Sequence, residues 1–370
     1  MKVVRMVDTC QIKRGEYTVE DLQKGKFYIM SDAIHQMIQV LAPGVFGLEI
    51  PFHEVYNEYK GQSLGNKRVL AIRHGGGGDI LFMSTAMKIV KRRNPEAKIS
   101  LGVGAQYRPL VEGESEFYKI YDLPILLDDW NNYHYHAYFE GLIEGSREAE
   151  EFNAYDLFIK SVGYDPKEVP AADKIPHINI NAYALFRVGE VFDKQFKNGR
   201  PRVGIQAMTS TSIRNYPPSL WPAVAEKLIK RGFDVYFLGS TAQSHMIGNL
   251  CEAVGANCYN GVFEKLVDSL ALASQMNYFI GPDSLFIHVA GALGRPVVGI
   301  YGPFKSALRM QYFKSAIGID VEVGCSPCFM HGHFPCYKGD PSPCFSVISP
   351  DVVIKSFDVL KEEVDGQAAS

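Results

Sequence analysis

Four consecutive glycines, Gly75 to Gly78, constrain the fold of this chain more than any other feature of its sequence. They follow a short apolar run, Val69 to Ile72, which is typical of a buried strand. Apolar residues then recur at helical spacing from Ile80 to Val90, Asn94-Pro95 ends this pattern, and Ile99 to Val103 is again typical of a strand. A strand, a glycine loop, a helix and a second strand form the building block of parallel α/β sheets.

The same order of elements begins again after Asn198-Gly199-Arg200-Pro201, which we interpret as a linker. Val203 to Ile205 is a predicted strand, and Ser219 is placed to cap the helix that follows. Further strands are predicted at residues 235–238, 278–280 and 297–300, and further helices begin near residues 243, 264 and 285. Two such halves predict an α/β protein with two Rossmann-like domains that face each other across a cleft, with ligands at the carboxyl ends of the strands.

A length of 370 residues also favours two domains, because one hydrophobic core rarely supports a chain of this size. We predict an N-terminal domain over residues 67–198 and a C-terminal domain over residues 199–370. Residues 1–66 do not follow the α/β pattern: strands are predicted at 17–19 and 27–30, then a helix from Ser31-Asp32 to Leu41, so we predict a small α+β appendage. The aromatic stretch Asp128 to Phe139 is predicted to be a loop at the rim of the cleft, or else a surface tyrosine cluster.

Charged residues make up 21% of the chain and the net charge is −3, so nucleic acid is not an expected partner. No segment approaches the ~20 uninterrupted apolar residues of a membrane-spanning helix, and the N-terminus lacks the apolar core of a signal peptide. We therefore expect a cytoplasmic protein. The basic run Lys88 to Lys98 faces either an anionic surface, such as that of the inner membrane, or solvent at the end of a helix.

The glycine loop leads directly into Asp79, the first candidate for chemistry. Gly77 and Gly78 free the backbone for close approach to a ligand, and we predict that they contact it. The glycines lack the spacing of a dinucleotide-binding motif, and a carboxylate at this position would repel a pyrophosphate. We therefore predict that Asp79 is a general base that accepts a proton from an acceptor hydroxyl; the alternative is that it only caps the helix.

A second candidate site begins at Asp283, just after a predicted strand. The N–H groups at the start of the following helix favour a diphosphate, and Ser284 adds a hydroxyl. His288 lies one helical turn beyond Ser284 and can reach the same group. The alternative is a capped helix with a satisfied histidine.

Three motifs occur in order: Arg73-x4-Gly78-Asp79-Ile80-Leu81, then Asp283-Ser284-x3-His288 with Ala290-x-Ala292-Leu293-Gly294-x-Pro296, then Tyr301-Gly302-Pro303. In this order they resemble glycosyltransferase family 9, which contains the ADP-heptose:lipopolysaccharide heptosyltransferases. The resemblance covers roughly residues 67 to 362. It implies a GT-B fold and an inverting transfer, without a catalytic metal, from an ADP-activated heptose.

The resemblance also implies roles for single residues. Asp79 matches the proposed base of the family, and Arg214 matches a basic residue, usually lysine, that steadies the donor phosphates before an aromatic-proline pair. An arginine keeps the charge of that lysine but changes its geometry. The residues implied in donor binding are Asp283, Ser284, Leu285 through its N–H, His288, and Gln243 at the ribose.

Two of the donor-binding positions depart from the family pattern as well. Leu285 stands where the family usually has glycine, and Gln243 stands where it commonly has an acidic residue, whose carboxylate binds hydroxyls more strongly than an amide. These departures leave room for a different nucleotide or sugar.

Four of the seven cysteines, Cys325, Cys328, Cys336 and Cys344, fall within twenty residues. Four thiolates at this spacing suit a tetrahedral zinc ion, or an iron ion in the same cage, and four protein ligands favour a structural over a catalytic metal. His331 and His333 are reserve ligands. Similar segments occur in family relatives that glycosylate autotransporter proteins and bind iron. The alternative is four structural thiols, reduced or crosslinked.

The resulting hypothesis is a glycosyltransferase that moves a sugar from an ADP-sugar to a hydroxyl of a cell-surface glycan or protein. Two alternatives are a nucleotide-sugar epimerase on the same fold, which needs a second acid/base group, and a non-catalytic module that binds sugar nucleotides. The acceptor and the oligomeric state are not written in the sequence.

Overall fold

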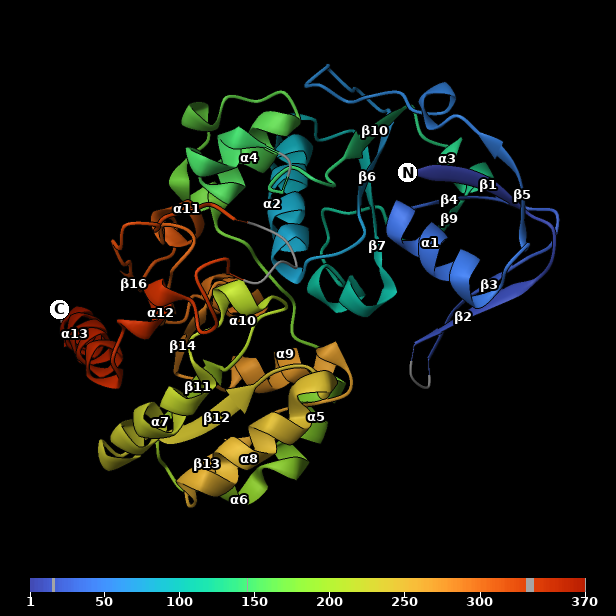
Figure 1. The fold of residues 1–370 in the computed structure, drawn as a ribbon. Coiled ribbons are helices and arrows are strands. Elements are labelled where there is room, and N and C mark those ends of the chain that lie inside the picture. The colour runs from blue at the N-terminus through green and yellow to red at the C-terminus, as the bar shows by residue number, and fades with distance from the viewer. Residues whose placement is uncertain (15–16, 145, 331–335, 370) are drawn as a thin grey trace. The chain divides into compact units, whose positions relative to one another are not determined.

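The protein is described by a computed structural model over residues 1–14, 17–144, 146–330 and 336–369 (Figure 1). Its contacts divide the chain into two compact units. Unit 1 comprises Met1–Glu140 and Phe158–Val169, and unit 2 comprises Gly141–Leu157 and Pro170–Ser370. Each unit contains one parallel sheet. The domain boundaries at residues 67 and 199 stay a prediction.

The N-terminal part of unit 1 has an α+β arrangement, and one strand of its sheet comes from residues 125–126. Its antiparallel sheet has the order β5-β1-β4-β9, and β2 and β3 form a separate hairpin. Helix α1 (Asp32–Leu41) begins as predicted, because the Ser31 hydroxyl accepts a hydrogen bond from the Ile34 N–H at 3.2 Å. The strands are β1 (Lys2–Met6), β2 (Cys10–Arg14), β3 (Tyr17–Leu22), β4 (Phe27–Met30), β5 (Phe46–Ile50) and β9 (Ile125–Leu126).

The rest of unit 1 is built on a four-stranded parallel sheet of order β10-β6-β7-β8. The strands are β6 (Arg68–Arg73), β7 (Lys98–Gly104), β8 (Lys119–Leu123) and β10 (Tyr135–Tyr138). Helix α2 (Gly77–Arg93) packs on β6 and β7 and ends at Asn94 as predicted. Phe158, from α4 (Ala154–Ser161), stacks on Phe139 with 5.3 Å between ring centroids.

The prediction of a loop over Asp128 to Phe139 is wrong. The stretch contains helix α3 (Leu127–Trp130) and then β10, which pairs in parallel with β6. Ala137 in this strand and Phe139 directly after it are buried. His136 is buried as well, because its ring stacks on Trp130 at 3.9 Å. Polar and aromatic residues here form the edge of a sheet.

The basic run at the end of α2 is not a continuous charged face. Lys88 is buried and forms an ion pair with Glu114, which is also buried. Lys91 donates to the backbone carbonyls of Pro95 and Ala97. Part of this charge is therefore used inside unit 1.

Unit 2 contains a six-stranded parallel sheet of order β13-β12-β11-β14-β15-β16. Counted along the chain, this is the strand order 3-2-1-4-5-6 of a doubly wound Rossmann sheet. The order reverses between β11 and β14, and ligands bind such sheets at the carboxyl ends of the strands at this switch point. The strands are β11 (Arg202–Gln206), β12 (Asp234–Leu238), β13 (Cys258–Asn260), β14 (Tyr278–Pro282), β15 (Val297–Ile300) and β16 (Ala316–Ile319).

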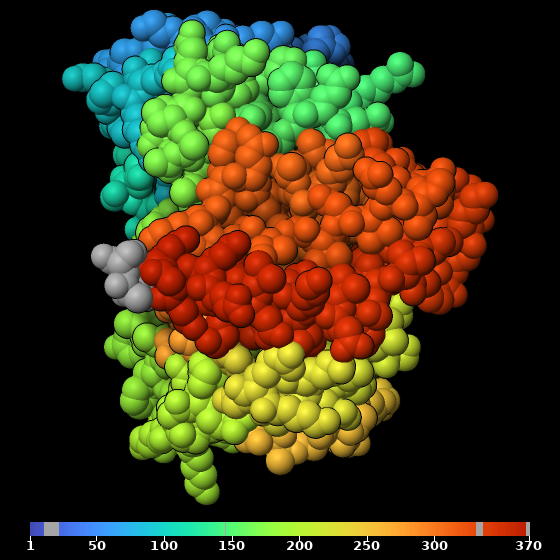
Figure 2. Space-filling view, turned by 90° about the vertical axis from the view of Figure 1, so that its left-hand side faces the viewer, coloured from blue at the N-terminus to red at the C-terminus, as the bar shows by residue number. Residues whose placement is uncertain are grey.

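Four helices of unit 2, which span residues 221–230, 244–254, 343–346 and 350–369, bury apolar residues in one core with this sheet. Figure 2 shows the red C-terminal residues as a ridge on unit 2, where α13 packs against α7, β15 and β16. The helices are α5 (Ala182–Val191), α6 (Asp193–Phe196), α7 (Trp221–Lys230), α8 (Ser244–Val254), α9 (Leu266–Ser274), α10 (Leu285–Ala292), α11 (Ala307–Met310), α12 (Pro343–Ser346) and α13 (Pro350–Ala369). None of the described helices is long and apolar enough to cross a membrane.

The prediction that Ser219 caps α7 is wrong. It lies inside a short 3-10 helix, Pro218–Leu220, and Leu220 takes the N-cap position without a side-chain hydrogen bond. Pro217 and Pro218 fix the backbone for this extra turn, so the chain enters α7 through it.

Candidate functional site

In unit 1, three charged side chains gather where the strand order reverses between β6 and β10. Arg73, the last residue of β6, directs Nη2 to Asp79 Oδ2 at 2.6 Å and Nη1 to Glu140 Oε2 at 3.3 Å. Glu140, just beyond β10, also accepts a hydrogen bond from the His74 N–H. Arg73 is buried, so one guanidinium fixes both carboxylates.

The sequence suggested that Asp79 lies on an exposed turn, but it lies in a helix. Helix α2 begins at Gly77, so Gly77 and Gly78 are helical and Asp79 lies in the first turn. Its side chain is 16% exposed. The loop between β6 and α2 is His74 to Gly76, so only two of the four glycines lie in it, and the Asp79 carboxylate keeps a limited opening to solvent.

Gly76 is a position that only glycine fits. Its φ of +78° lies in the left-handed region, and a Cβ there would come within 2.0 Å of Asp79 Oδ2. The missing side chain therefore makes the space that the Asp79 carboxylate occupies.

In unit 2, the corresponding switch point lies between β11 and β14. Gln206, the last residue of β11, accepts a hydrogen bond at Oε1 from the Phe286 N–H at 3.0 Å. Ser284 is the N-cap residue of α10, but its side chain makes no cap hydrogen bond. The N–H groups of Ser284 and Leu285 lie at the start of α10, where the partial positive charge of the helix favours an anion.

Arg214 is fixed at this helix start from the neighbouring loop. Its Nη1 donates to the backbone carbonyl of Asp283 at 2.9 Å. Its Nε and Nη2 donate to the hydroxyls of Thr211 and Ser210, each at 3.1 Å. The side chain is 20% exposed, so its charge is positioned and still accessible to a ligand.

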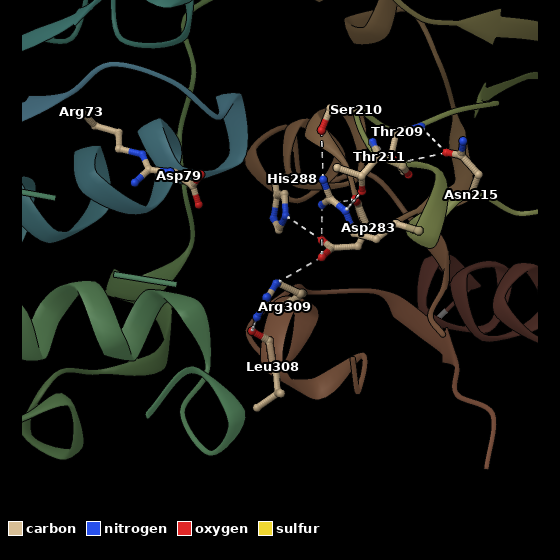
Figure 3. Close-up of polar contacts among 11 residues, drawn as sticks. Arg73, Asp79, Thr209, Ser210, Thr211, Asn215, Asp283, His288, Leu308 and Arg309 are labelled. Carbon is tan, nitrogen blue, oxygen red and sulfur yellow. Dashed lines mark hydrogen bonds and ion pairs between the residues drawn. The ribbon is translucent and has the colours of Figure 1, made fainter. Parts of the chain in front are cut away.

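The Asp283 carboxylate is buried among three basic side chains (Figure 3). His288 Nε2 lies 3.5 Å from Oδ1, while Arg309 Nε and Arg214 Nη1 lie 3.3 Å and 3.7 Å from Oδ2. Burial alone would raise the pKa of Asp283, but Arg309, His288 and Arg214 lower the pKa far below its ordinary value. Asp283 is therefore an anion that organises the cations around it.

The structure brings Arg214, Asp283, Ser284, Leu285 and His288 together at one helix start. Gln243 lies beyond β12, where its Oε1 accepts a hydrogen bond from the Ser240 N–H at 3.0 Å in a capping box. Its Nε2 is the part of the side chain that suits a ribose hydroxyl.

The four clustered cysteines are free thiols in the structure, and Cys344 is buried. Burial raises the pKa of Cys344 to about 11. Within the described residues, no three His, Cys, Asp or Glu side chains gather in an arrangement that could hold a metal ion. His331 and His333 lie outside the described residues. A metal on these thiols stays a prediction.

Two residues of these clusters were not singled out from the sequence. Glu140 was missed because its strand was interpreted as a loop, although a carboxylate directly after a parallel strand is the signal that finds such residues. Arg309 belongs to no motif of the sequence, and only the fold brings it to Asp283.

The two doubly wound units define a GT-B fold, and solved structures agree. The ADP-heptose lipopolysaccharide heptosyltransferase II of E. coli superposes with a TM-score of 0.62 at 18% identity, over 80% of this chain and 99% of its own. The iron-containing dodecameric glycosyltransferase TibC of enterotoxigenic E. coli H10407 gives a TM-score of 0.59 at 14% identity, over 98% of this chain and 92% of its own.

The family model of glycosyltransferase family 9 (heptosyltransferase) matches residues 156–337, and this confirms the predicted resemblance. Lipopolysaccharide heptosyltransferase 2 of Salmonella typhimurium is 27% identical over 177 residues, which are 44% of this chain and 50% of that protein. The alignment thus spans half of this relative. The family match includes Arg214, Gln243 and the start of α10, and it does not reach Asp79.

Proposed function

We propose that the chain is an inverting glycosyltransferase that moves a heptose from ADP-heptose to a hydroxyl of a cell-surface glycan or protein. The observation that carries this proposal is the anchored Arg214 beside the start of α10, at the switch point of the unit 2 sheet. A fixed cation and helix-start N–H groups suit the diphosphate of a nucleotide sugar. The family match over the same residues supports it.

On the donor side, Arg214 stabilises the charge that develops on the leaving ADP, so no catalytic metal is needed. The hydroxyl of Ser284 and the N–H of Leu285 bind the diphosphate, and His288 is held in place by Asp283. Gln243 binds the ribose through its amide. TibC has also been solved in complex with ADP-D-β-D-heptose, which supports this choice of donor.

On the acceptor side, Asp79 takes the proton of the attacking hydroxyl. Inversion requires the base on one face of the anomeric carbon and the leaving diphosphate on the other. Arg73 and Gly76 keep the Asp79 carboxylate in one orientation, which is what a positioned base requires. Gly77 and Gly78, the first residues of α2, leave the backbone open for close approach of the donor.

The four clustered cysteines belong to this proposal as the site of a structural zinc or iron ion. The support comes from TibC, an iron-containing glycosyltransferase whose structure superposes on 98% of this chain. We further propose a cytoplasmic enzyme that works as a peripheral protein at the inner membrane.

Isothermal calorimetry against ADP, UDP, GDP and ADP-heptose tests the donor assignment. We expect ADP and ADP-heptose to bind, with UDP and GDP weaker by about tenfold or more, which is about 1.4 kcal/mol. A preference for UDP, or no binding of any nucleotide, would contradict the proposal.

A further inference from the structure

Arg309 is a buried arginine beside Asp283 (Figure 3). Its Nε lies 3.3 Å from Asp283 Oδ2, and its Nη1 donates to the Leu308 carbonyl at 3.1 Å. Its guanidinium carbon stands 4.9 Å from the centroid of the Phe304 ring, which is also buried. A cation held over an aromatic ring and against a carboxylate has little freedom to turn toward a ligand.

Asp283 creates an electrostatic difficulty for the function proposed above. Its carboxylate is 7% exposed and lies beside the helix start that is to bind a diphosphate. A negative charge in a poorly solvated position repels an incoming anion strongly, because little water screens it. The site therefore needs a cation that neutralises the Asp283 carboxylate, so that a second cation stays available to the ligand.

Arg214 is poorly suited to that task. It is anchored to Asp283 through the backbone carbonyl at 2.9 Å, and its distance to the carboxylate oxygen is 3.7 Å. Without a closer cation, the carboxylate would attract the guanidinium of Arg214 away from the ligand. Arg309 is closer to the same oxygen, at 3.3 Å.

We propose that Arg309 is a positioning residue for the donor: it neutralises Asp283, so that the charge of Arg214 acts on the diphosphate of the nucleotide sugar. This inference rests on the proposed function, because it assumes that a nucleotide sugar binds at the start of α10. Arg309 itself does not touch the donor. Its effect is carried by Asp283 and Arg214.

The test uses the full chain and measures ADP binding by calorimetry for wild type, Arg309→Met, Asp283→Asn and the double variant. Arg309→Met keeps an apolar stem on Phe304 and removes the charge. We expect it to weaken ADP binding by about tenfold and the double variant to regain most of that loss, because two groups in contact do not act additively. Arg309→Lys is expected to stay within about threefold of wild type, because it keeps the charge.

If Arg309 had a merely structural role, each substitution would loosen the packing. The double variant would then bind ADP more weakly than Arg309→Met alone. Steady-state kinetics adds a second readout: Arg309→Met should raise KM for the donor more than it lowers kcat. The matched control is Arg231→Met with Asp358→Asn, an ion pair of 2.9 Å in unit 2 whose side chains are 38% and 39% exposed, and we expect no change from it.

Circular dichroism shows whether each variant is folded. If Arg309→Met is unfolded, the comparison of Arg309→Lys with the double variant tests the inference. Binding by Arg309→Met within about twofold of wild type would overturn the inference, and so would a double variant weaker than Arg309→Met. Wild-type protein that binds no ADP would instead contradict the proposed function, and the inference with it.

Discussion

Arg214 donates a hydrogen bond from Nη1 to the backbone carbonyl of Asp283 at 2.9 Å, although the two residues lie 69 positions apart in the chain. The contact joins the loop after β11 to the end of β14, the two neighbouring strands between which the sheet order reverses. A side chain anchored at a switch point keeps its position without any ligand. Arg214 is thus preorganised for an anion.

Replacing Arg214 tests this anchoring. Arg214→Ala should weaken ADP binding by about tenfold to a hundredfold, because it removes a charged donor worth about 1.5–3 kcal/mol. Arg214→Lys should lose less, since it keeps the charge but cannot reach both Asp283 and the hydroxyls of Thr211 and Ser210. Calorimetry with ADP measures both. Equal binding by Arg214→Ala and wild type would remove Arg214 from the donor site.

Gly76→Ala should reduce kcat by about a hundredfold, because the new Cβ displaces the Asp79 carboxylate and misplacing a reacting group by about 1 Å has effects of this size. The same change should cost about 1 kcal/mol of stability through the left-handed φ of +78°. Gly75→Ala is the matched control, since a Cβ there meets nothing within 4 Å. If the two variants lose activity equally, Gly76 has no special relation to Asp79.

His136 predicts an acid-sensitive unit 1. Burial lowers the pKa of His136 to about 4, from 6.5 in an unfolded chain. Because the pKa of His136 is lower in the folded protein, the unfolded chain binds the proton first as the pH falls. The free energy of unfolding is therefore unaffected above pH 6.5 and decreases as the pH falls towards 4. The loss is about 3 kcal/mol at most.

Chemical denaturation followed by Trp130 fluorescence measures this loss in a Trp221→Phe background, which leaves Trp130 as the single tryptophan. His136→Phe keeps a ring on Trp130, and its free energy of unfolding should fall less steeply between pH 6.5 and 4 than that of the protein with His136. Identical slopes for the two proteins would show that other groups cause the acid sensitivity.

The metal prediction is tested by elemental analysis of protein purified without added metal. We expect about one zinc or iron per chain, as four thiolates complete one tetrahedral site. Cys328→Ser and Cys344→Ser should each lose it, whereas Cys10→Ser, which lies in unit 1, should keep it. Wild-type protein without metal would leave the four cysteines as thiols.

The strongest periodic patterns predicted the fold well. Strand β15 and helix α1 have the predicted bounds, because apolar periodicity and a serine cap are local signals. The pattern failed at β10, whose His136 is buried only because Trp130 provides a ring to stack on. Such a contact is set by tertiary structure.

The predicted donor residues could be found from the sequence where a strand leads into a helix, as at Asp283 and Ser284. The orientation of Asp79 could not, because it depends on the guanidinium of Arg73 and on the space beside Gly76. Arg309 could not either, since its position follows from how α11 packs beside β16 and no motif marks it.

The most direct test of the central claim is a transfer assay with Asp79→Asn, using ADP-heptose as donor and a lipopolysaccharide core or protein acceptor. The variant should bind ADP as wild type does, within about twofold, and lose heptose transfer by about a hundredfold or more, since a positioned base contributes about 10²–10⁴-fold. Transfer by Asp79→Asn at the rate of wild type would contradict the account.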